Sequence, residues 1–175
     1  NDIAIYAIHT NLDNVYNGVN AKICEKLELK NIRILSPKKE LLRKLYTFCP
    51  IEKADEVRKA LFEAGAGHIG NYDECSYNME GFGIFRAMEG TNPYIGEKGK
   101  QHQEKELKIE IIYPAYQEKN ILKALFTAHP YEEVAYDIIS LENDHSRVGS
   151  GMIGELEKPA DEYPFLKRIK KQMKT

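Results

Sequence analysis

A histidine and an aspartate four positions apart are the first residues of this chain whose types suggest chemistry. In "IAIYAIHTNLD" an apolar run stops at His9, and Asp13 follows in a polar segment. An imidazole and a carboxylate together suit a divalent metal ion such as Zn, Fe, Mn or Ni. A metal needs more than two protein ligands, however, and nothing nearby in the sequence supplies the others. Spacing alone therefore favours a second interpretation, in which Asp13 or Asn11 caps the following helix and His9 bonds to backbone.

A second group of titratable residues lies in "AHPYEEVAYD", residues 128–137. His129 is expected at the end of a helix that Pro130 stops, and Glu132 and Glu133 follow at the start of a strand. The carboxylates could ligate a metal or act as acid and base groups, but alternation along a strand puts the two glutamates on opposite faces. On spacing alone, a helix stop followed by a charged edge strand is the favoured interpretation.

The remaining motifs favour structure over chemistry. The glycine-rich stretch at 63–73 follows a predicted helix instead of opening one, which is the wrong direction for a phosphate-binding loop. The stretch "EGTNPYIGEKG" at 89–99 is predicted to be a surface turn, although long loops in compact domains often carry function. His102 is expected to be solvated. Few, widely spaced cysteines without a C-x-x-C pair favour a reducing compartment.

The composition limits the classes of partner. The 175 residues are 42% hydrophobic and 30% charged, with a formal net charge of −2. This balance gives no broad basic surface for nucleic acid or for an anionic membrane. No apolar run reaches the roughly 18 residues that a membrane span needs. The sequence therefore predicts a cytoplasmic protein that binds neither membranes nor nucleic acid.

Hydrophobic periodicity predicts an α+β chain. Helices are expected at 14–30, 53–65, 118–129 and 161–174. Strands are expected at 3–8, 31–35, 45–49, 68–79, 82–88, 107–114, 132–142 and 152–156. A turn at Glu80 and Gly81 is expected to join two of these strands as a hairpin, and a long polar loop is expected at 89–106.

The middle of the chain, residues 38–142, reads strand, helix, strand hairpin, strand, helix, strand. Two strand–helix–strand units of this kind describe a ferredoxin-like α+β domain with both helices on one face of a sheet. The flanking residues 1–37 and 143–175 hold too few elements to close a core, because an isolated strand–helix–strand leaves its sheet edges open. We therefore expect an inserted ferredoxin-like domain between two partial α/β pieces of a main domain, in a segment of a longer protein.

Several long stretches resemble one known family, and they occur in the expected order. "IAIYAIHTNLDNVYNGVN" is similar to the middle of the GTP cyclohydrolase I type 2 homolog family, also called the NGG-one-interacting-factor-three-like family. "ALFEAGAGHIGNYDECSY", "EGTNPYIGEKG" and "AHPYEEVAYDI" resemble the inserted domain of its longer bacterial members, which is similar to CutA and PII-like folds. "GSGMIGELEKP" resembles the return to the main domain. The resemblance covers nearly the whole chain.

The resemblance implies a dinuclear metal centre in the full-length protein, holding ions such as Zn, Fe, Mn or Ni. Asp13 becomes a metal ligand, and His9 becomes a ligand or a neighbouring group that orients or protonates a bound water or substrate oxygen. The family's other ligands, a His-His pair upstream and a His with a Glu downstream, lie outside these residues. The implied function is metal-dependent hydrolysis of a phosphorylated or heterocyclic small molecule, with the site incomplete in this segment. The family typically forms a hexameric ring.

The resemblance also implies two non-enzymatic alternatives. CutA and PII-like domains trimerise and sense small ligands or metals, so residues 38–142 could regulate or gate the ring. The interacting-factor name implies an adaptor that binds transcription factors within a ring-shaped homo-oligomer. In the sensing alternative, the ligand-facing residues of the inserted domain are Asn92, Tyr94, His129, Glu132 and Glu133.

Overall fold

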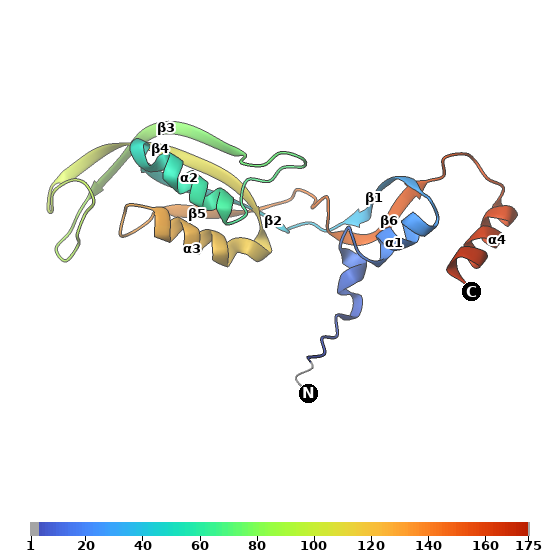
Figure 1. The fold of residues 1–175 in the computed structure, drawn as a ribbon. Helices are drawn as coiled ribbons and strands as arrows, with labels where there is room; N and C mark the ends of the chain where they lie inside the picture. The colour runs from blue at the N-terminus through green and yellow to red at the C-terminus, as the bar shows by residue number, and fades with distance from the viewer. Residues whose placement is uncertain (1–3, 175) are drawn as a thin grey trace. The chain divides into compact units, whose positions relative to one another are not determined.

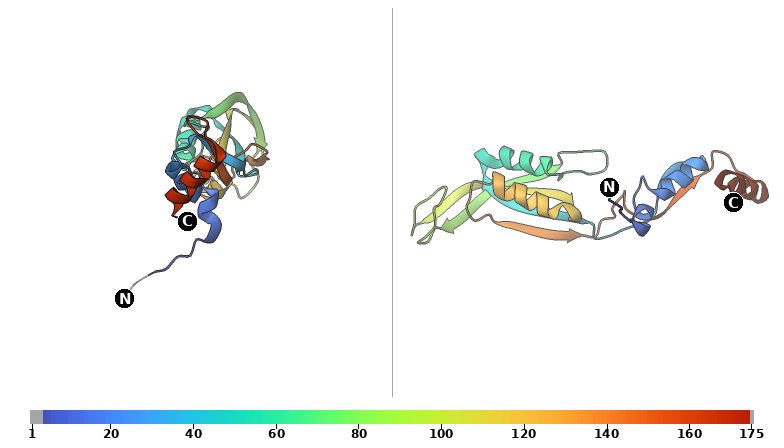
Figure 2. Two further views of the ribbon diagram at one scale, coloured as in Figure 1. Left: turned by 90° about the vertical axis from the view of Figure 1, so that its right-hand side faces the viewer. Right: turned by 60° about the horizontal axis from the view of Figure 1, so that its bottom comes forward.

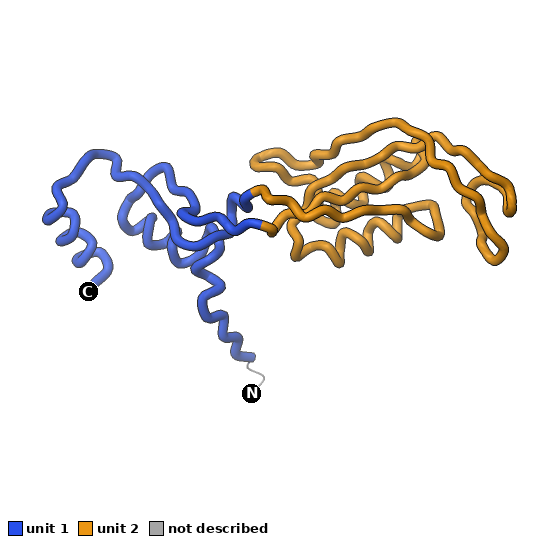
Figure 3. The backbone as a smooth tube through the Cα atoms, turned by 180° about the vertical axis from the view of Figure 1, so that it is seen from behind, with its two compact units in different colours: residues 1–39, 144–175 blue, residues 40–143 orange. Residues whose placement is uncertain are grey.

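The computed structural model describes residues 4–174, which fold as two compact units. Residues 1–39 and 144–175 belong to unit 1, and residues 40–143 form unit 2 (Figure 3). Each unit contains helices and antiparallel strands, so the predicted mixture of the two is confirmed. Within the described part of the chain, every helix is too short or too polar to cross a membrane.

Unit 2 consists of a four-stranded sheet with helices (Figure 1). Its elements in chain order are β2 (Leu42–Pro50), η2 (Ile51–Lys53), α2 (Ala54–Glu63), β3 (Ser76–Arg86), β4 (Gln101–Pro114), η3 (Ala115–Gln117), α3 (Glu118–Ala128) and β5 (Tyr136–Leu141). The strands lie in the order β3-β4-β2-β5, and every neighbouring pair is antiparallel. The helices predicted at 53–65 and 118–129 are confirmed as α2 and α3.

The core of unit 2 lies between one face of this sheet and the two helices. Alternation turns Leu45 and Cys49 of β2 to this face, and Ile111 of β4 joins them because it pairs with Leu45. Both helices lie on this side of the sheet in Figure 1 and in the right-hand view of Figure 2. The buried residues come from β2, α2, β4, α3 and the residue Ala66: Leu45, Cys49, Ala54, Val57, Leu61, Ala66, Ile109, Ile111, Tyr113, Ile121 and Leu125.

The hairpin predicted through Glu80 and Gly81 is wrong. Residues 76–86 form the single strand β3, in which Glu80 pairs with Leu107 and Gly81 pairs with Glu106 of β4. A glycine after a polar residue is a turn signal when only its neighbours are considered. The long-range pairing with β4 overrides that local signal and keeps the strand continuous.

Other strand boundaries in unit 2 also differ from the prediction. The polar loop expected at 89–106 is shorter, because β4 begins at Gln101 and pairs with the end of β3. Residues 68–75 lie outside the strands, and β5 begins at Tyr136, four residues later than expected. In each case the apolar alternation alone did not indicate where the partner strand supplies backbone hydrogen bonds.

Unit 1 contains a two-stranded antiparallel sheet, β1 with β6. Its elements are η1 (His9–Asn14), α1 (Val19–Lys26), β1 (Lys30–Pro37), β6 (Gly149–Glu155) and α4 (Glu162–Met173). The strand predicted at 3–8 is wrong for residues 4–8, which form no regular structure before η1, whereas residue 3 lies outside the described residues. Ile5 is 92% exposed there, so no described sheet buries this apolar run.

Candidate functional site

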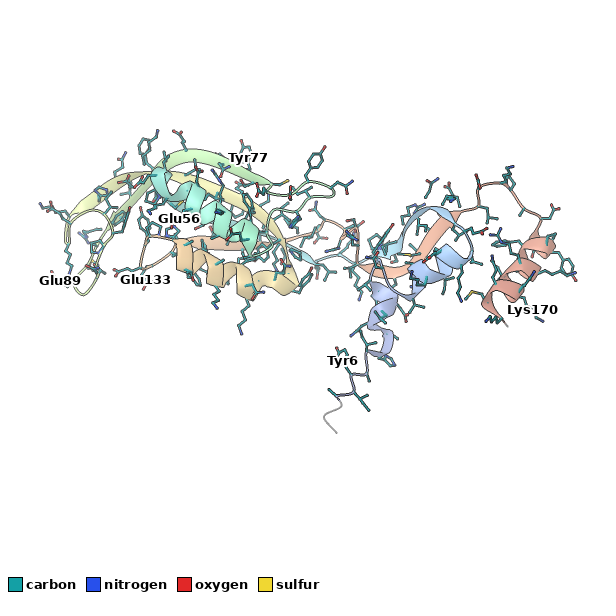
Figure 4. The ribbon with its side chains drawn as sticks, viewed as in Figure 1. Tyr6, Glu56, Tyr77, Glu89, Glu133 and Lys170 are labelled. Atoms are coloured by element: carbon teal, nitrogen blue, oxygen red, sulfur yellow. The ribbon has the colours of Figure 1, made fainter. Side chains whose placement is uncertain are left out.

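Unit 2 contains a groove of about 630 Å³. Its lining residues come mainly from the paired strands β3 and β4, from the loop that joins them, and from the segment between α3 and β5. In Figure 4, Glu89 marks this loop and Glu133 marks this segment. Apolar and aromatic side chains make up most of its wall, and its charged lining residues are mainly glutamates. A groove of this size and composition is typical of small-molecule sites.

A buried carboxylate lines this groove. Glu106 of β4 is 8% exposed, and its Oε1 accepts a hydrogen bond of 2.8 Å from the Tyr131 hydroxyl. Burial and this bond to a carboxylate raise the pKa of Tyr131 above its usual range, so the phenol keeps its proton and keeps donating. Gly83 leaves room for the carboxylate, because a Cβ at that position would lie 2.2 Å from Glu106 Oε2.

Aromatic rings gather around Tyr131. Its ring centroid lies 6.1 Å from that of Phe85 and 6.2 Å from that of Tyr94. His129 is closer, at 5.1 Å, and Phe85 also meets His102 edge-on at 5.5 Å. Pairs at these distances attract one another beyond the effect of burial. The expectation that His102 is simply solvated is therefore wrong, since it is half-buried against Phe85.

His129 supports the groove without lining it. It is 6% exposed, and backbone groups occupy both of its ring nitrogens. Nε2 lies 2.9 Å from the Phe48 carbonyl oxygen, and Nδ1 lies 3.1 Å from the Tyr131 backbone nitrogen. Because a carbonyl only accepts and an amide only donates, Nε2 carries the proton and the ring is neutral. Burial lowers the pKa of His129 below its usual value, which agrees with this neutral form.

Glu132 fastens the loop between β3 and β4. Its two carboxylate oxygens accept hydrogen bonds from the Asn92 backbone N–H, at 2.9 and 3.1 Å. Within the loop, the Thr91 hydroxyl donates to the Met88 carbonyl oxygen at 2.8 Å. The loop is therefore held both internally and to the segment that precedes β5, so it forms a defined wall of the groove.

The five residues that the sequence singled out in unit 2 have different places. Tyr94, Glu132 and Glu133 line the groove. Asn92 contributes its backbone N–H to Glu132, and His129 is buried next to Tyr131's backbone. Three of the five can therefore face a ligand, whereas Asn92 and His129 hold the wall in place.

Among the groove residues that the sequence did not single out are Phe85, Glu106 and Tyr131. Glu106 ends the stretch predicted as a polar loop, where a glutamate is common. Phe85 gains its place only through pairing, which sets it opposite His102. Of these three residues, Tyr131 could have been predicted from the sequence, because it lies between the predicted helix stop and the two glutamates of "HPYEE".

The turn that holds His9 and Asp13 lies in unit 1 and forms η1. Both side chains are exposed. His9 Nδ1 lies 3.3 Å from the Thr10 hydroxyl, and the backbone carbonyl of Asp13 accepts a bond of 2.8 Å from Asn20 Nδ2. The helix-cap interpretation is wrong, because α1 has Gly18 at its N-cap and no side-chain cap.

Asp13 and His9 do not by themselves fit a metal ion. Among residues 4–174 no three His, Cys, Asp or Glu side chains lie close enough together to hold one. Two donors are fewer than protein-bound metals use, so an ion at this turn needs ligands from other residues. His9 does have a φ of 47°, in the left-handed region where residues other than glycine are uncommon.

Comparison with known proteins assigns the family. The family described as Duf34/NIF3 (NGG1p interacting factor 3) matches residues 1–175. The chain therefore belongs to the Duf34/NIF3 family, which confirms the resemblance found in the sequence.

Curated relatives and a solved structure agree with this assignment. A protein of Halalkalibacterium halodurans named GTP cyclohydrolase 1 type 2 homolog is 46% identical over 171 residues, covering 97% of this chain and 46% of that protein. A protein of the same name in Bacillus subtilis is 43% identical over 157 residues, covering 89% of this chain and 42% of that protein. A Bacillus cereus protein related to NIF3 has a TM-score of 0.85 at 43% identity, covering 99% of this chain and 46% of that one. The chain spans just under half the length of these relatives.

Proposed function

We propose that unit 2 of this family member is a small-ligand-binding module that regulates the protein or gates access to it. The groove of about 630 Å³ supports this proposal, because two of its carboxylates, Glu106 and Glu132, already have hydrogen-bond partners in the protein. Tyr131 fixes Glu106, and Glu132 fixes the loop through Asn92. Groups that are positioned before a ligand arrives lower the cost of binding it.

The topology of unit 2 supports the same proposal. Its order of strand, helix, strand, strand, helix, strand, with the sheet order β3-β4-β2-β5, supports the proposal that unit 2 is a ferredoxin-like domain. We propose that it is the CutA- and PII-like inserted domain expected at 38–142, between partial α/β pieces at 1–37 and 143–175. We therefore expect unit 2 to sense a small ligand, as the resemblance to CutA- and PII-like domains implies.

A fragment screen on the 175-residue chain by ligand-observed NMR tests whether the groove binds small molecules. Tyr94→Ala removes one ring from the wall and leaves the hydrogen bond between Tyr131 and Glu106 in place. Fragments should bind this variant about tenfold more weakly than they bind the wild type. Tyr116→Ala is the matched control, since Tyr116 is 75% exposed and outside the groove. Fragments that bind both variants equally well would place the binding site elsewhere and contradict the proposal.

A second candidate function rests on family membership. Relatives 46% and 43% identical to this chain are named GTP cyclohydrolase 1 type 2 homolog. We propose that the whole protein is a metal-dependent hydrolase of a heterocyclic or phosphorylated small molecule, with Asp13 as a metal ligand and His9 beside it. Two divalent ions such as Zn, Fe, Mn or Ni would polarise the substrate and activate water. The exposure of both side chains leaves them free to meet ligands from other residues.

Metal content of the full-length protein tests this second candidate. Plasma mass spectrometry on protein purified without added metal should find about two ions per subunit, and Asp13→Ala should lower that number. Glu157→Ala is the control, because Glu157 is another exposed carboxylate of unit 1. Equal metal content in wild type and Asp13→Ala would remove Asp13 from the ligand set.

We also propose that the protein is a homo-oligomer, as a hexameric ring or as a trimer through unit 2. The sheet face opposite α2 and α3 supports this proposal. Tyr77 of β3, which pairs with Glu110 on that face, is 63% exposed. Ile139 of β5, which pairs with Lys44 on the same face, is 47% exposed, and both residues lie outside the groove lining. Exposed apolar side chains on one sheet face are typical of association surfaces, and light scattering would measure the oligomer.

A further inference from the structure

We infer that the groove of unit 2 selects a planar organic cation with N–H donors and rejects phosphorylated ligands. This inference rests on the proposed function, since it presumes that the groove binds a small ligand. It concerns the charge and the shape of that ligand, which the buried Glu106, the unpaired glutamates and the aromatic wall together define.

The charged side chains of the groove give it a negative field. They are Lys108 and four glutamates: Glu80, Glu106, Glu132 and Glu133. Lys108 is already engaged, because its Nζ lies 2.8 Å from Glu110 Oε1 and 4.3 Å from the centroid of the Tyr46 ring. A ligand in the groove therefore meets an excess of carboxylates.

Three of the four groove glutamates lack a cationic partner. Glu80 pairs with Lys105 at 2.8 Å. Within residues 4–174, none of the ion pairs includes Glu106, Glu132 or Glu133. A phosphate in this groove would face like charges, whereas a cation would gain their attraction, so the groove discriminates between the two.

Glu106 is the strongest anchor for such a cation. It is 8% exposed, and Tyr131 satisfies only its Oε1. Among the described residues, none donates a hydrogen bond to Oε2, which lies beside the bare Cα of Gly83. Oε2 is not one of the buried side-chain atoms without a partner among the described residues, so it is accessible from the groove. A ligand N–H that reaches it would form a charge-assisted hydrogen bond, which is stronger than a neutral one.

The aromatic wall sets the shape of the ligand. The ring centroids of Phe85 and Tyr94 lie 6.1 and 6.2 Å from that of Tyr131, and Tyr94 is 47% exposed. Aromatic faces attract flat apolar ligands and, more strongly, flat cations. A protonated amino-heterocycle combines the flat body, the positive charge and the N–H donors that these residues recognise.

Two fluorescent probes of opposite charge test the inference on the 175-residue chain. Proflavine is a planar diamino cation, and 1-anilinonaphthalene-8-sulfonate is an apolar anion of similar size. We expect proflavine to bind saturably and at least about tenfold more tightly than the anion, with an affinity that falls as salt is added.

Charge-removing variants identify the carboxylate responsible. Glu106→Gln should weaken proflavine binding by roughly tenfold to a hundredfold, because a charge-assisted bond is lost. Glu133→Gln keeps the buried pair intact and should weaken binding by about threefold. Glu63→Gln on α2 is the matched control and should bind as wild type does, since Glu63 lies outside the groove. Circular dichroism checks that each variant is folded.

The outcomes separate this inference from the proposed function. Saturable proflavine binding that Glu106→Gln weakens supports both. Binding of the anion alone, weakened by Tyr94→Ala, overturns the inference and leaves the groove as a ligand site. Proflavine binding that is equal in wild type, Glu106→Gln and Glu133→Gln also overturns it. If neither probe binds, the inference fails, and the proposed function fails as well only if the fragment screen also finds no ligand that Tyr94→Ala weakens.

Discussion

The groove of unit 2 and the His9 turn of unit 1 contain the same residue types in opposite surroundings. In the groove region, His129 and Glu106 are 6% and 8% exposed, and both are bonded to other parts of unit 2. In the turn, the side chains of His9 and Asp13 are exposed, and the nearest partner of His9 is its neighbour Thr10. A histidine and a carboxylate are therefore held by hydrogen-bond partners in one unit and exposed in the other.

This difference determines what a substitution can reveal in each unit. A buried polar group that is removed leaves its partner without a hydrogen bond, so the loss appears as reduced stability. An exposed side chain with no such partner can be removed at almost no cost in stability. Function at the turn must therefore be measured through what it binds, whereas the groove can be tested through stability as well.

The largest difference between the two units should appear when a residue in the core of unit 2 is replaced. Leu61 of α2 is 0% exposed, and Leu61→Ala should lower the stability of unit 2 by about 2–5 kcal/mol, through lost burial and a cavity. Leu166→Ala in α4 is the matched control, because Leu166 is 52% exposed. Amide hydrogen exchange of β4 and β6 reports the two units separately. Relative to wild type, Leu61→Ala should speed up amide exchange in β4 more than in β6. A larger increase in β6 would contradict the assignment of this core to unit 2.

The next largest difference should be in the stability that is lost when His129 or His9 is replaced. His129→Ala leaves the Phe48 carbonyl and the Tyr131 amide without partners, at about 1–3 kcal/mol for each buried group. His9→Ala should change stability by less than about 0.5 kcal/mol. Chemical denaturation followed by circular dichroism measures both. A similar loss for the two variants would mean that the His9 turn is held by contacts as firmly as the groove.

Acid should weaken unit 2 through His129. Burial holds its pKa in the folded state below the 6.5 expected for the unfolded chain, so the unfolded chain binds the proton first. The stability that the neutral ring contributes is present above pH 6.5 and is lost as the pH falls through the folded-state pKa. His129→Gln cannot titrate, so its unfolding free energy should fall less between neutral and acid pH than that of the wild type. Parallel pH curves for the two proteins would refute this prediction.

The sequence predicted the helices of unit 2 better than its strands. Apolar residues recur at helical spacing in α2 and α3, and glycine or proline follows each helix, so the local signals agree with the fold. Gly81 gave a local turn signal inside β3, where pairing with Glu106 of β4 decides the structure. Strand limits depend on a partner that is distant in sequence, and no local pattern contains that information.

The candidate site was predictable only in part for the same reason. The motif "HPYEE" and the loop with Tyr94 indicated where a ligand could bind, because titratable and aromatic residues cluster there. The burial of Glu106 arises from Tyr131 and from the missing side chain of Gly83, which are distant from it in sequence. Exposure of the His9 turn was likewise unpredictable, since an apolar run before it suggests a buried strand.

The smallest difference is expected between substitutions of two neighbouring glutamates, Glu132 and Glu133. Glu132 accepts the Asn92 amide through both carboxylate oxygens, whereas Glu133 has no hydrogen bond with any described residue. Glu132→Gln weakens this bond by removing its charge, so the Asn92 amide should exchange with solvent about threefold faster. Glu133→Gln removes the same charge one position away and should leave that amide unchanged. An equal effect of both variants would show that the negative charge of the segment, and not the bond to Asn92, holds the loop against the groove.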